Sequence, residues 1–298
     1  MKRLFYLSLC MLLMGTFSCK KDPIKNTVLN ITAINDNSSQ IVSVQLNSMQ
    51  KKSFSIGCHV GSSTTFNAKN KTFGYMDCND VYHIIDVEAG VEIKQIPLPT
   101  YLSLVVVDTL RNLLIGQYYV DGANQNDGTD HVLTINLENG NVVSDHQFYV
   151  GGWWDGSTCF FRDIENEYVL LREDNTLVFI NPPTGNITKT VQLSTEVGNG
   201  VYDRNNNRLI GSYYSNETNK NHIVIVDINT GKTLSNVVAQ GLGAHLAFEM
   251  DFDPETNCYV LVSSDNAVLF FDIYTGELKE KYQLDFELVS LKLWRSEL

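Results

Sequence analysis

The stretch His222–Gly231, HIVIVDINTG, decides the fold: a short apolar run ends in an acidic residue, and a glycine follows four positions later. The same shape recurs at Val81–Gly90, His131–Gly140, Thr176–Gly185 and Val268–Gly276. The closing glycines are residues 90, 140, 185, 231 and 276, so the successive steps are 50, 45, 46 and 45 residues. A repeat of this length, with several short strands in each unit, is typical of a β-propeller.

The strand count predicts six blades. Five units of four strand-like runs lie between about residues 63 and 284, and three further runs precede them (Thr27–Ile34, Gln40–Leu46 and Ser53–Ile56). One run, Leu288–Trp294, is left at the C-terminal end. A blade completed by both chain ends closes the ring and leaves no unpaired sheet face. We therefore expect an all-β fold, a single six-bladed propeller of four-stranded blades in which the N-terminal strands pair with the C-terminal strand.

The repeat resembles the YVTN and quinoprotein-like propeller repeats, in which an apolar strand ends at Asp and turns at Thr-Gly. Asp227–Lys232 (DINTGK) and Asp272–Glu277 (DIYTGE) fit this pattern, whereas Asn181–Gly185 (NPPTG) keeps only the glycine. The resemblance implies a fold and no particular function. The glycines themselves are expected at positive φ in tight hairpins, and neither GxGxxG nor a P-loop occurs.

Length and charge exclude some classes of function. The 298 residues are 43% apolar, which is enough for a large core in one domain. The net charge is −12, and it becomes −14 (20 basic against 34 acidic residues) once Lys2 and Arg3 are removed with a leader. An acidic chain without a basic stripe does not favour nucleic-acid binding.

The N-terminus is predicted to be a targeting segment. Lys2 and Arg3 precede the apolar run Leu4–Met14, and Thr16–Cys19 (TFSC) is followed by Lys20-Lys21-Asp22. This pattern resembles the lipobox of Bacteroides-type lipoproteins. The resemblance implies a signal peptide at 1–18, a lipidated Cys19 with a tether at 19–26, and a propeller domain at 27–298, anchored in the bacterial cell envelope and expected at the outer membrane. The alternative is ordinary signal-peptidase cleavage with Cys19 unmodified.

Four cysteines remain after Cys10 and Cys19, without the spacing of a zinc site. Cys58 precedes an innermost strand and Cys78 ends its antiparallel neighbour, so both fall at one end of a blade. They form a candidate disulfide in an exported protein. Four buried thiols acting as small apolar side chains are the alternative.

The loops at one end of the blades carry the candidate contact residues. Counting from each hairpin glycine to the next innermost strand places eight residues there: His59, Tyr101, Trp153, Trp154, Asp155, Asn199, His245 and Glu287. All of them except Asn199 are taken as candidate ligand- or partner-binding residues. Two adjacent tryptophans in an extended segment point to opposite sides, so at least one is expected to be exposed or to cap the channel. The alternative places one in an inter-blade groove with the other covering it. A metal held by His59 and His245 with Asp155 or Glu287, and calcium in the oxygen-rich loop 121–130, are weaker hypotheses, because neither has a ligand-like spacing.

The sequence favours a binding protein over an enzyme. It contains no GxSxG, HExxH or sialidase-type Asp-box motif. We expect a non-enzymatic, lipid-anchored propeller that binds a ligand or an envelope protein through its loops, with no cofactor and no metal. A lyase or hydrolase with a site at the channel mouth is the alternative, and quinone-dependent redox chemistry is suggested only by the family resemblance.

Overall fold

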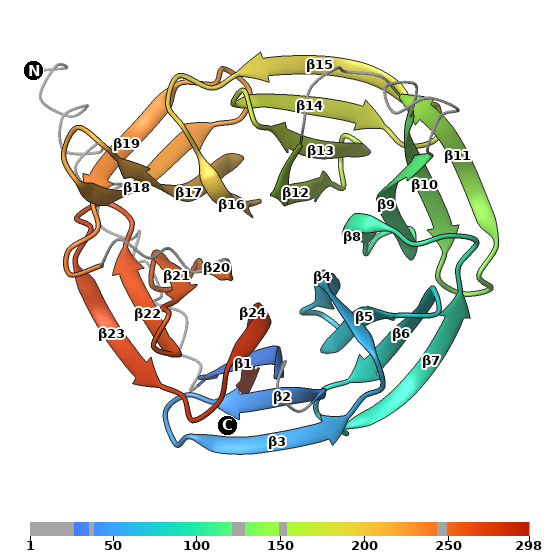
Figure 1. The fold of residues 1–298 in the computed structure, drawn as a ribbon, viewed down its shortest axis with the longest axis horizontal. Helices are drawn as coiled ribbons and strands as arrows, with labels where there is room; N and C mark the ends of the chain where they lie inside the picture. The colour runs from blue at the N-terminus through green and yellow to red at the C-terminus, as the bar shows by residue number, and fades with distance from the viewer. Residues whose placement is uncertain (1–26, 36–38, 121–128, 149–153, 243–248, 298) are drawn as a thin grey trace, which may run out of the picture.

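The computed structural model describes residues 27–35, 39–120, 129–148, 154–242 and 249–297. These residues form a wheel of six four-stranded antiparallel sheets around a central axis (Figure 1). The six-bladed propeller expected from the repeat is therefore confirmed.

Each blade is named here by its place in the chain, and its strands are given from the axis outwards. Blade 1 contains β4 (His59–Asn67), β5 (Thr72–Asp77), β6 (Val81–Asp86) and β7 (Val91–Pro97); blade 2 contains β8 (Ser103–Asp108), β9 (Leu113–Val120), β10 (Thr129–Asn136) and β11 (Val142–Phe148). Blade 3 contains β12 (Trp154–Arg162), β13 (Glu167–Arg172), β14 (Thr176–Asn181) and β15 (Asn186–Gln192); blade 4 contains β16 (Gly198–Asp203), β17 (Arg208–Ser215), β18 (Lys220–Asp227) and β19 (Thr233–Val238). Blade 5 contains β20 (Met250–Asp253), β21 (Cys258–Val262), β22 (Ala267–Asp272) and β23 (Leu278–Gln283).

Blade 6 joins the two ends of the chain. Its order is β24 (Leu288–Glu297), β1 (Thr27–Asn35), β2 (Gln40–Gln45) and β3 (Gln50–Ser55), with β24 innermost. The pairing runs from Thr27 opposite Glu297 to Asn35 opposite Leu288. The predicted closure of the ring by strands from both termini is therefore confirmed.

The core lies between the blades. Six apolar clusters of described residues are buried, and each lies between two neighbouring blades. The cluster between blades 5 and 6 includes Ile31, Val260 and Phe270, and the cluster between blades 6 and 1 packs Trp294 near Phe73. Burial of apolar side chains is the main stabilising term in folding. The two interfaces of blade 6 are buried and apolar like those between the other blades, so the ring is stabilised at its closure in the same way.

The repeated glycines occupy the conformation that the sequence predicts. All five have φ between 67° and 77°, a region that glycine adopts without steric cost. At Gly231 an added Cβ would overlap the carbonyl oxygen of Gln192 in the preceding blade, so this turn also packs closely against its neighbour. In the same turn, Asp227 accepts hydrogen bonds from the backbone N–H groups of Asn229 (3.0 Å) and Thr230 (2.8 Å).

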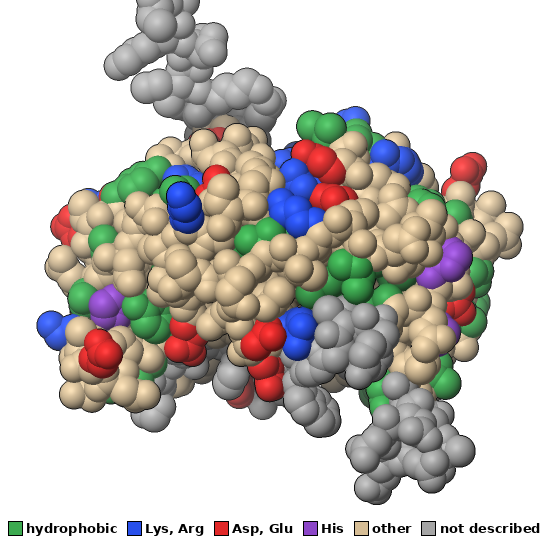
Figure 2. All heavy atoms as spheres, turned by 90° about the horizontal axis from the view of Figure 1, so that it is seen from above, with side chains coloured by type: hydrophobic (Ala, Val, Ile, Leu, Met, Phe, Trp, Pro, Cys, Tyr) green, Lys and Arg blue, Asp and Glu red, His purple; other side chains and the backbone are tan. Residues whose placement is uncertain are grey.

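The topology gives the wheel two different faces. One, the turn face, carries these glycine hairpins and the turns that link the first and second strands of blades 1 to 5. The opposite loop face carries the starts of the innermost strands and the turns between second and third strands. Between the two faces, the outermost strands form a rim on which apolar, charged and histidine side chains are interspersed (Figure 2).

Candidate functional site

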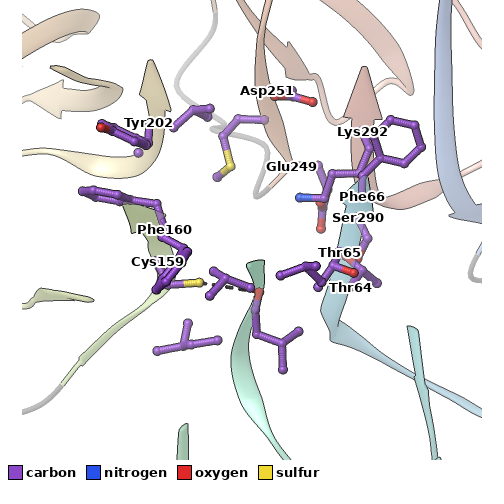
Figure 3. A pocket seen from close by; sticks show the side chains of 18 of the residues that line it. Thr64, Thr65, Phe66, Cys159, Phe160, Tyr202, Glu249, Asp251, Ser290 and Lys292 are labelled. Carbon is purple, nitrogen blue, oxygen red and sulfur yellow. Dashed lines mark hydrogen bonds between the residues drawn. The ribbon is translucent and has the colours of Figure 1, made fainter. Parts of the chain in front are cut away.

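A cavity of about 780 Å³ occupies the centre of the wheel. Its walls come from all six innermost strands, so it is a channel-like space on the propeller axis (Figure 3). The walls of blades 1 to 4 are mostly apolar, with Phe66, Leu104 and Phe160 among them, and Arg204 of blade 4 is their one charged residue. Blades 5 and 6 contribute charged side chains, namely Glu249, Asp251 and Lys292.

The innermost strands are bulged where they line this cavity. The pairing register shifts between Ser103 and Val106 in blade 2 and between Gly198 and Val201 in blade 4. Within these bulges Leu104 and Asn199 adopt positive φ (both 50°), which is uncommon outside glycine. Tyrosines of the following blades support the strained backbone: Tyr168 Oη donates to Leu104 O at 2.6 Å, and Tyr259 Oη donates to Asn199 O at 2.7 Å.

Two carboxylates of blade 5 bind the open edge of the C-terminal strand. Leu293 N–H donates to Asp251 Oδ2 at 2.7 Å, and Leu291 N–H donates to Glu249 Oε2 at 3.1 Å. These N–H groups belong to the innermost strand, where no further strand is present to accept them. Burial raises the pKa of Asp251, while the positive charge of Lys292 and the backbone hydrogen bonds act in the opposite direction.

Lys292 is the basic group of the cavity wall in β24. Its ammonium group points into the cavity (Figure 3). Within the part of the chain that the structure describes, Nζ takes part in no hydrogen bond or ion pair, although it attracts Asp251 over a longer distance. A half-buried ammonium with unused donors favours an incoming acceptor, because charge-assisted hydrogen bonds are about twice as strong as neutral ones.

The wall formed by blades 3 and 4 is aromatic and chemically unreactive. Phe160 stacks on Tyr202 with ring centroids 4.4 Å apart. Cys159 lies beside Phe160 with its Sγ directed to Val105 O at 4.0 Å (Figure 3). Burial raises the pKa of the Cys159 thiol to about 12, although Lys292 opposes the shift. The thiol is therefore protonated at neutral pH and a poor nucleophile.

The sequence-predicted residues are only partly covered by the structure. His59 begins β4, Tyr101 precedes β8 and Glu287 precedes β24, so these three lie at the loop-face end of adjacent blades. None of the three belongs to the cavity wall, which begins deeper in each strand. Tyr101 Oη instead bonds Ser63 Oγ at 3.0 Å. Their assignment to a binding site stays a prediction.

The tryptophan loop differs from the sequence expectation in one respect. Trp154 and Asp155 were expected in a loop, but their backbone already forms the start of β12, opposite Arg172. His59, also expected in a loop, is likewise the first residue of its strand. Bulges lengthen both innermost strands toward the loop face. Trp153, His245, the loop 121–128 and Cys19 lie outside the described residues.

The candidate disulfide is present. Cys58 and Cys78 are bonded, with their Cα atoms 5.6 Å apart, and they join the start of blade 1 to the turn between β5 and β6. Cys159 and Cys258 are free thiols. In the described part of the chain, no group of three or more His, Cys, Asp or Glu side chains is arranged to hold a metal ion.

The sequence reasoning missed the charged residues of the cavity. Glu249, Asp251 and Asp253 alternate in the segment EMDFD, which places all three on one side of an innermost strand. This alternation was the available signal, because carboxylates are rare in a strand buried at the centre of a propeller. For Lys292 the sequence offers no comparable signal.

A second repeated arrangement was also missed. In blades 1, 2 and 4 a tyrosine ring of the second strand packs against a histidine ring of the third, in the pairs Tyr75–His83, Tyr118–His131 and Tyr213–His222. In blade 2, His131 Nδ1 contacts Asp145 Oδ1 at 3.0 Å, and in blade 4 an amide, Asn236, replaces the acid. None of these side chains lines the cavity, and in blades 2 and 4 their hydrogen bonds connect the second, third and fourth strands.

Comparison with known proteins supports the fold and no closer relationship. No protein-family model matches the sequence, and no curated protein is significantly similar to it. Among solved structures, a protein of unknown function from Bacteroides caccae matches with a TM-score of 0.64 and 10% identity over 90% of this chain and 100% of that chain. The dihydro-heme d1 dehydrogenase NirN, in complex with DHE, matches with a TM-score of 0.51 and 8% identity over 85% of this chain. The match spans only 63% of the NirN chain. KlHsv2 with a replaced loop 6CD gives 0.51 and 12% identity over 84% and 76% of the two chains.

No helix among the described residues is long and apolar enough to cross a membrane.

Proposed function

We propose that this protein is a lipid-anchored, non-enzymatic binding protein of the bacterial cell envelope, and that it holds a small anionic ligand in its central cavity. The single observation that carries the ligand class is Lys292, a cation that points into a cavity of about 780 Å³ without a hydrogen-bond or ion-pair partner among the described residues. A volume of this size is in the range of small-molecule sites.

The wall opposite Lys292 indicates the chemical character of the part of the ligand that lies away from its anionic group. Leu104, Phe160 and Tyr202 offer apolar and aromatic surface, which suits a flat or apolar body attached to the anionic group. The carboxylates of Glu249 and Asp251 already accept hydrogen bonds from backbone N–H groups of β24. These hydrogen bonds join blade 5 to blade 6. Lys292 and Arg204 balance the charge of these two carboxylates in the lining, and Lys292 keeps unused donors, so a carboxylate or phosphate on an apolar frame suits the cavity.

The proposed location in the cell envelope rests on the N-terminal lipobox-like segment and is supported by the disulfide. The lipobox-like segment ending at Cys19 implies a lipid anchor. A disulfide between the exposed residues Cys58 and Cys78 suits an oxidising compartment outside the cytosol. A Cys19→Ala variant should move from the membrane fraction to the soluble fraction, and an unchanged distribution would contradict the anchor.

The ligand proposal is tested with a panel of mono- and dicarboxylates, aromatic carboxylates and inorganic phosphate. Protein comprising residues 20–298 would be screened by thermal shift, and hits would be measured by calorimetry. Lys292→Met should weaken binding of a hit by about tenfold or more, because one charge-assisted hydrogen bond is worth roughly 1.5–3 kcal/mol.

Lys281→Met is the matched control. Lys281 lies on the outermost strand β23 and pairs with Asp265 at 3.2 Å, far from the axis, so this variant should bind as the unmodified protein does. If no anion in the panel binds, or if both lysine variants retain the same affinity, the proposal is wrong.

A further inference from the structure

The first described residue of the chain lies on the turn face. Thr27 begins β1, the second strand of blade 6, so it occupies the level at which the other blades turn from first to second strand. Arg295 connects it to such a turn: its Nη1 donates to Thr27 Oγ1 at 3.4 Å, and its Nη2 bonds Asp253 Oδ2 at 2.6 Å in blade 5. The described chain therefore enters the wheel on this face, at Thr27.

Two exposed apolar side chains lie on the same face. Leu110 is 69% exposed in the turn between β8 and β9, and Ile164 is 89% exposed in the turn between β12 and β13. They occupy equivalent positions, two residues beyond the ends of the paired first strands at Asp108 and Arg162. The equivalent position in blades 1, 4 and 5 carries a polar residue (Lys69, Asn205 and Glu255). Single exposed apolar residues are ordinary on a protein surface, but two on neighbouring turns form a small apolar patch.

Charged groups hold these two turns together. Arg111 Nη1 donates to Asp108 Oδ2 at 2.8 Å within its own turn and to Asp163 O at 3.3 Å in the next. Arg204 of blade 4 pairs with Asp163 Oδ2 at 2.5 Å. The side chains of Arg111 and Arg204 remain 43% and 59% exposed, so both guanidinium groups stay accessible beside Leu110 and Ile164.

We propose that the turn face rests on a lipid bilayer, with Leu110 and Ile164 entering the headgroup boundary and Arg111 and Arg204 reaching lipid phosphates. This rests on the proposed lipid anchor at Cys19. Residues 20–26 span at most about 25 Å when extended, which keeps the part of the face around Thr27 close to the bilayer.

The two contacts lie on opposite sides of the wheel. Thr27 belongs to blade 6, Ile164 belongs to blade 3 directly across the axis, and Leu110 belongs to blade 2 beside it (Figure 1). A tether in blade 6 and apolar side chains in blades 2 and 3 would give the face contacts on both sides of the axis and hold it parallel to the membrane. Two weak attachments of this kind combine into a stable one, as they do for other peripheral proteins. The loop face, with the disulfide, then points away from the bilayer.

The test uses the full-length lipidated protein in vesicles of phosphatidylethanolamine and phosphatidylglycerol. An environment-sensitive NBD fluorophore would be attached to the introduced cysteine in Leu110→Cys or Ile164→Cys. The protein without an introduced cysteine would be treated in the same way to measure background labelling of its native cysteines. Glu173→Cys is the matched control, because Glu173 lies in blade 3 as well but in the turn on the loop face. All three positions are exposed, and unchanged thermal unfolding would verify that the fold is intact.

The proposal expects blue-shifted emission at positions 110 and 164 and quenching by spin-labelled lipid, with neither effect at position 173. Vesicle flotation is measured on the same samples. Flotation without quenching at 110 and 164 overturns the docked orientation and leaves the anchor intact. Absence of flotation overturns the anchor and the docking together, and quenching at 173 alone shows that the opposite face is the one in contact.

Discussion

The carboxylate of Asp251 in blade 5 accepts the backbone N–H of Leu293 in blade 6 at 2.7 Å. It thereby links the last blade built from consecutive residues to the blade that combines both ends of the chain. The second oxygen of the same carboxylate accepts Phe252 N–H at 2.8 Å. Asp251 is thus a structural acceptor at the ring closure as well as a neighbour of the cavity.

Replacing Asp251 with alanine should lower the free energy of unfolding by about 1–3 kcal/mol, the cost of leaving a buried donor unsatisfied. Urea denaturation measures the loss. Glu255→Ala is a suitable control, because Glu255 also reaches blade 6, through Arg295 Nε at 3.1 Å, but its side chain is exposed. That change should cost less than about 1 kcal/mol. Equal losses for both variants would show that the contact of Asp251 with β24 contributes no more to the free energy of unfolding than an exposed ion pair does.

A pair of glycine substitutions separates backbone strain from steric overlap. Gly231 and Gly241 both have positive φ, but a Cβ at Gly231 would overlap Gln192 O, whereas a Cβ at Gly241 has nothing within 4 Å. Gly241→Ala should cost about 1–2 kcal/mol from its backbone conformation alone. Gly231→Ala should cost clearly more when both are measured by thermal or urea unfolding. Similar values would mean that the hairpin can move away from the preceding blade.

The stability contributed by Asp227 should depend on pH. Partial burial raises the pKa of this carboxyl, but the hydrogen bonds from Thr230 and Asn229 outweigh it and hold the pKa below its usual value. Because the folded pKa is lower than the unfolded value of about 3.9, the contribution is full above that value and is lost as the pH falls through the folded pKa.

Asp227→Asn should therefore destabilise the protein by about 1 kcal/mol near pH 7, and the difference should shrink below pH 4. The substitution is tolerated by the fold, since blade 3 has Asn181 at the equivalent position, with Oδ1 accepting Thr184 Oγ1 at 2.9 Å. Urea titrations of both proteins at several pH values provide the measurement. A difference that stays constant down to pH 2 would contradict the assignment of the lowered pKa to Asp227.

Thiol reactivity should distinguish the four cysteines of a protein spanning residues 20–298. Burial raises the pKa of both Cys159 and Cys258, and the other two residues form a disulfide. Iodoacetamide at pH 8 should leave the native protein unmodified, since the reaction needs a thiolate. Two adducts should form after mild reduction and four after reduction under denaturing conditions, as measured by intact mass. Rapid alkylation of Cys159 in the native protein would contradict its enclosed position.

Much of the fold follows from local sequence features. In blades 1 to 5 a positive-φ glycine every 45 to 50 residues marks the hairpin, and the apolar run before it marks the third strand. A second signal is just as regular: Asn112, Asn166, Asn207 and Asn257 all have positive φ in the turn between first and second strands. Asparagine tolerates that conformation, so these turns are also encoded locally.

The candidate site is less predictable because it depends on contacts between blades. Leu104 carries no mark in the sequence that it will adopt positive φ, and its conformation depends on a hydrogen bond from Tyr168, 64 residues away. Likewise, Lys292 faces the cavity only because the C-terminal strand is innermost. Loop counting located His59, Tyr101 and Glu287 at the loop-face end, but it could not show that a bulged β4 begins as early as His59.

The position of β1 between β24 and β2 also determines how the protein bears mechanical load. A pull on residues before Thr27 acts along β1, and hydrogen-bond ladders on both sides resist it at the same time. Such shear loading requires many bonds to fail together, whereas peeling breaks them one by one. A protein held by its N-terminal end under flow would therefore transmit the force into the middle of a sheet and keep its wheel intact.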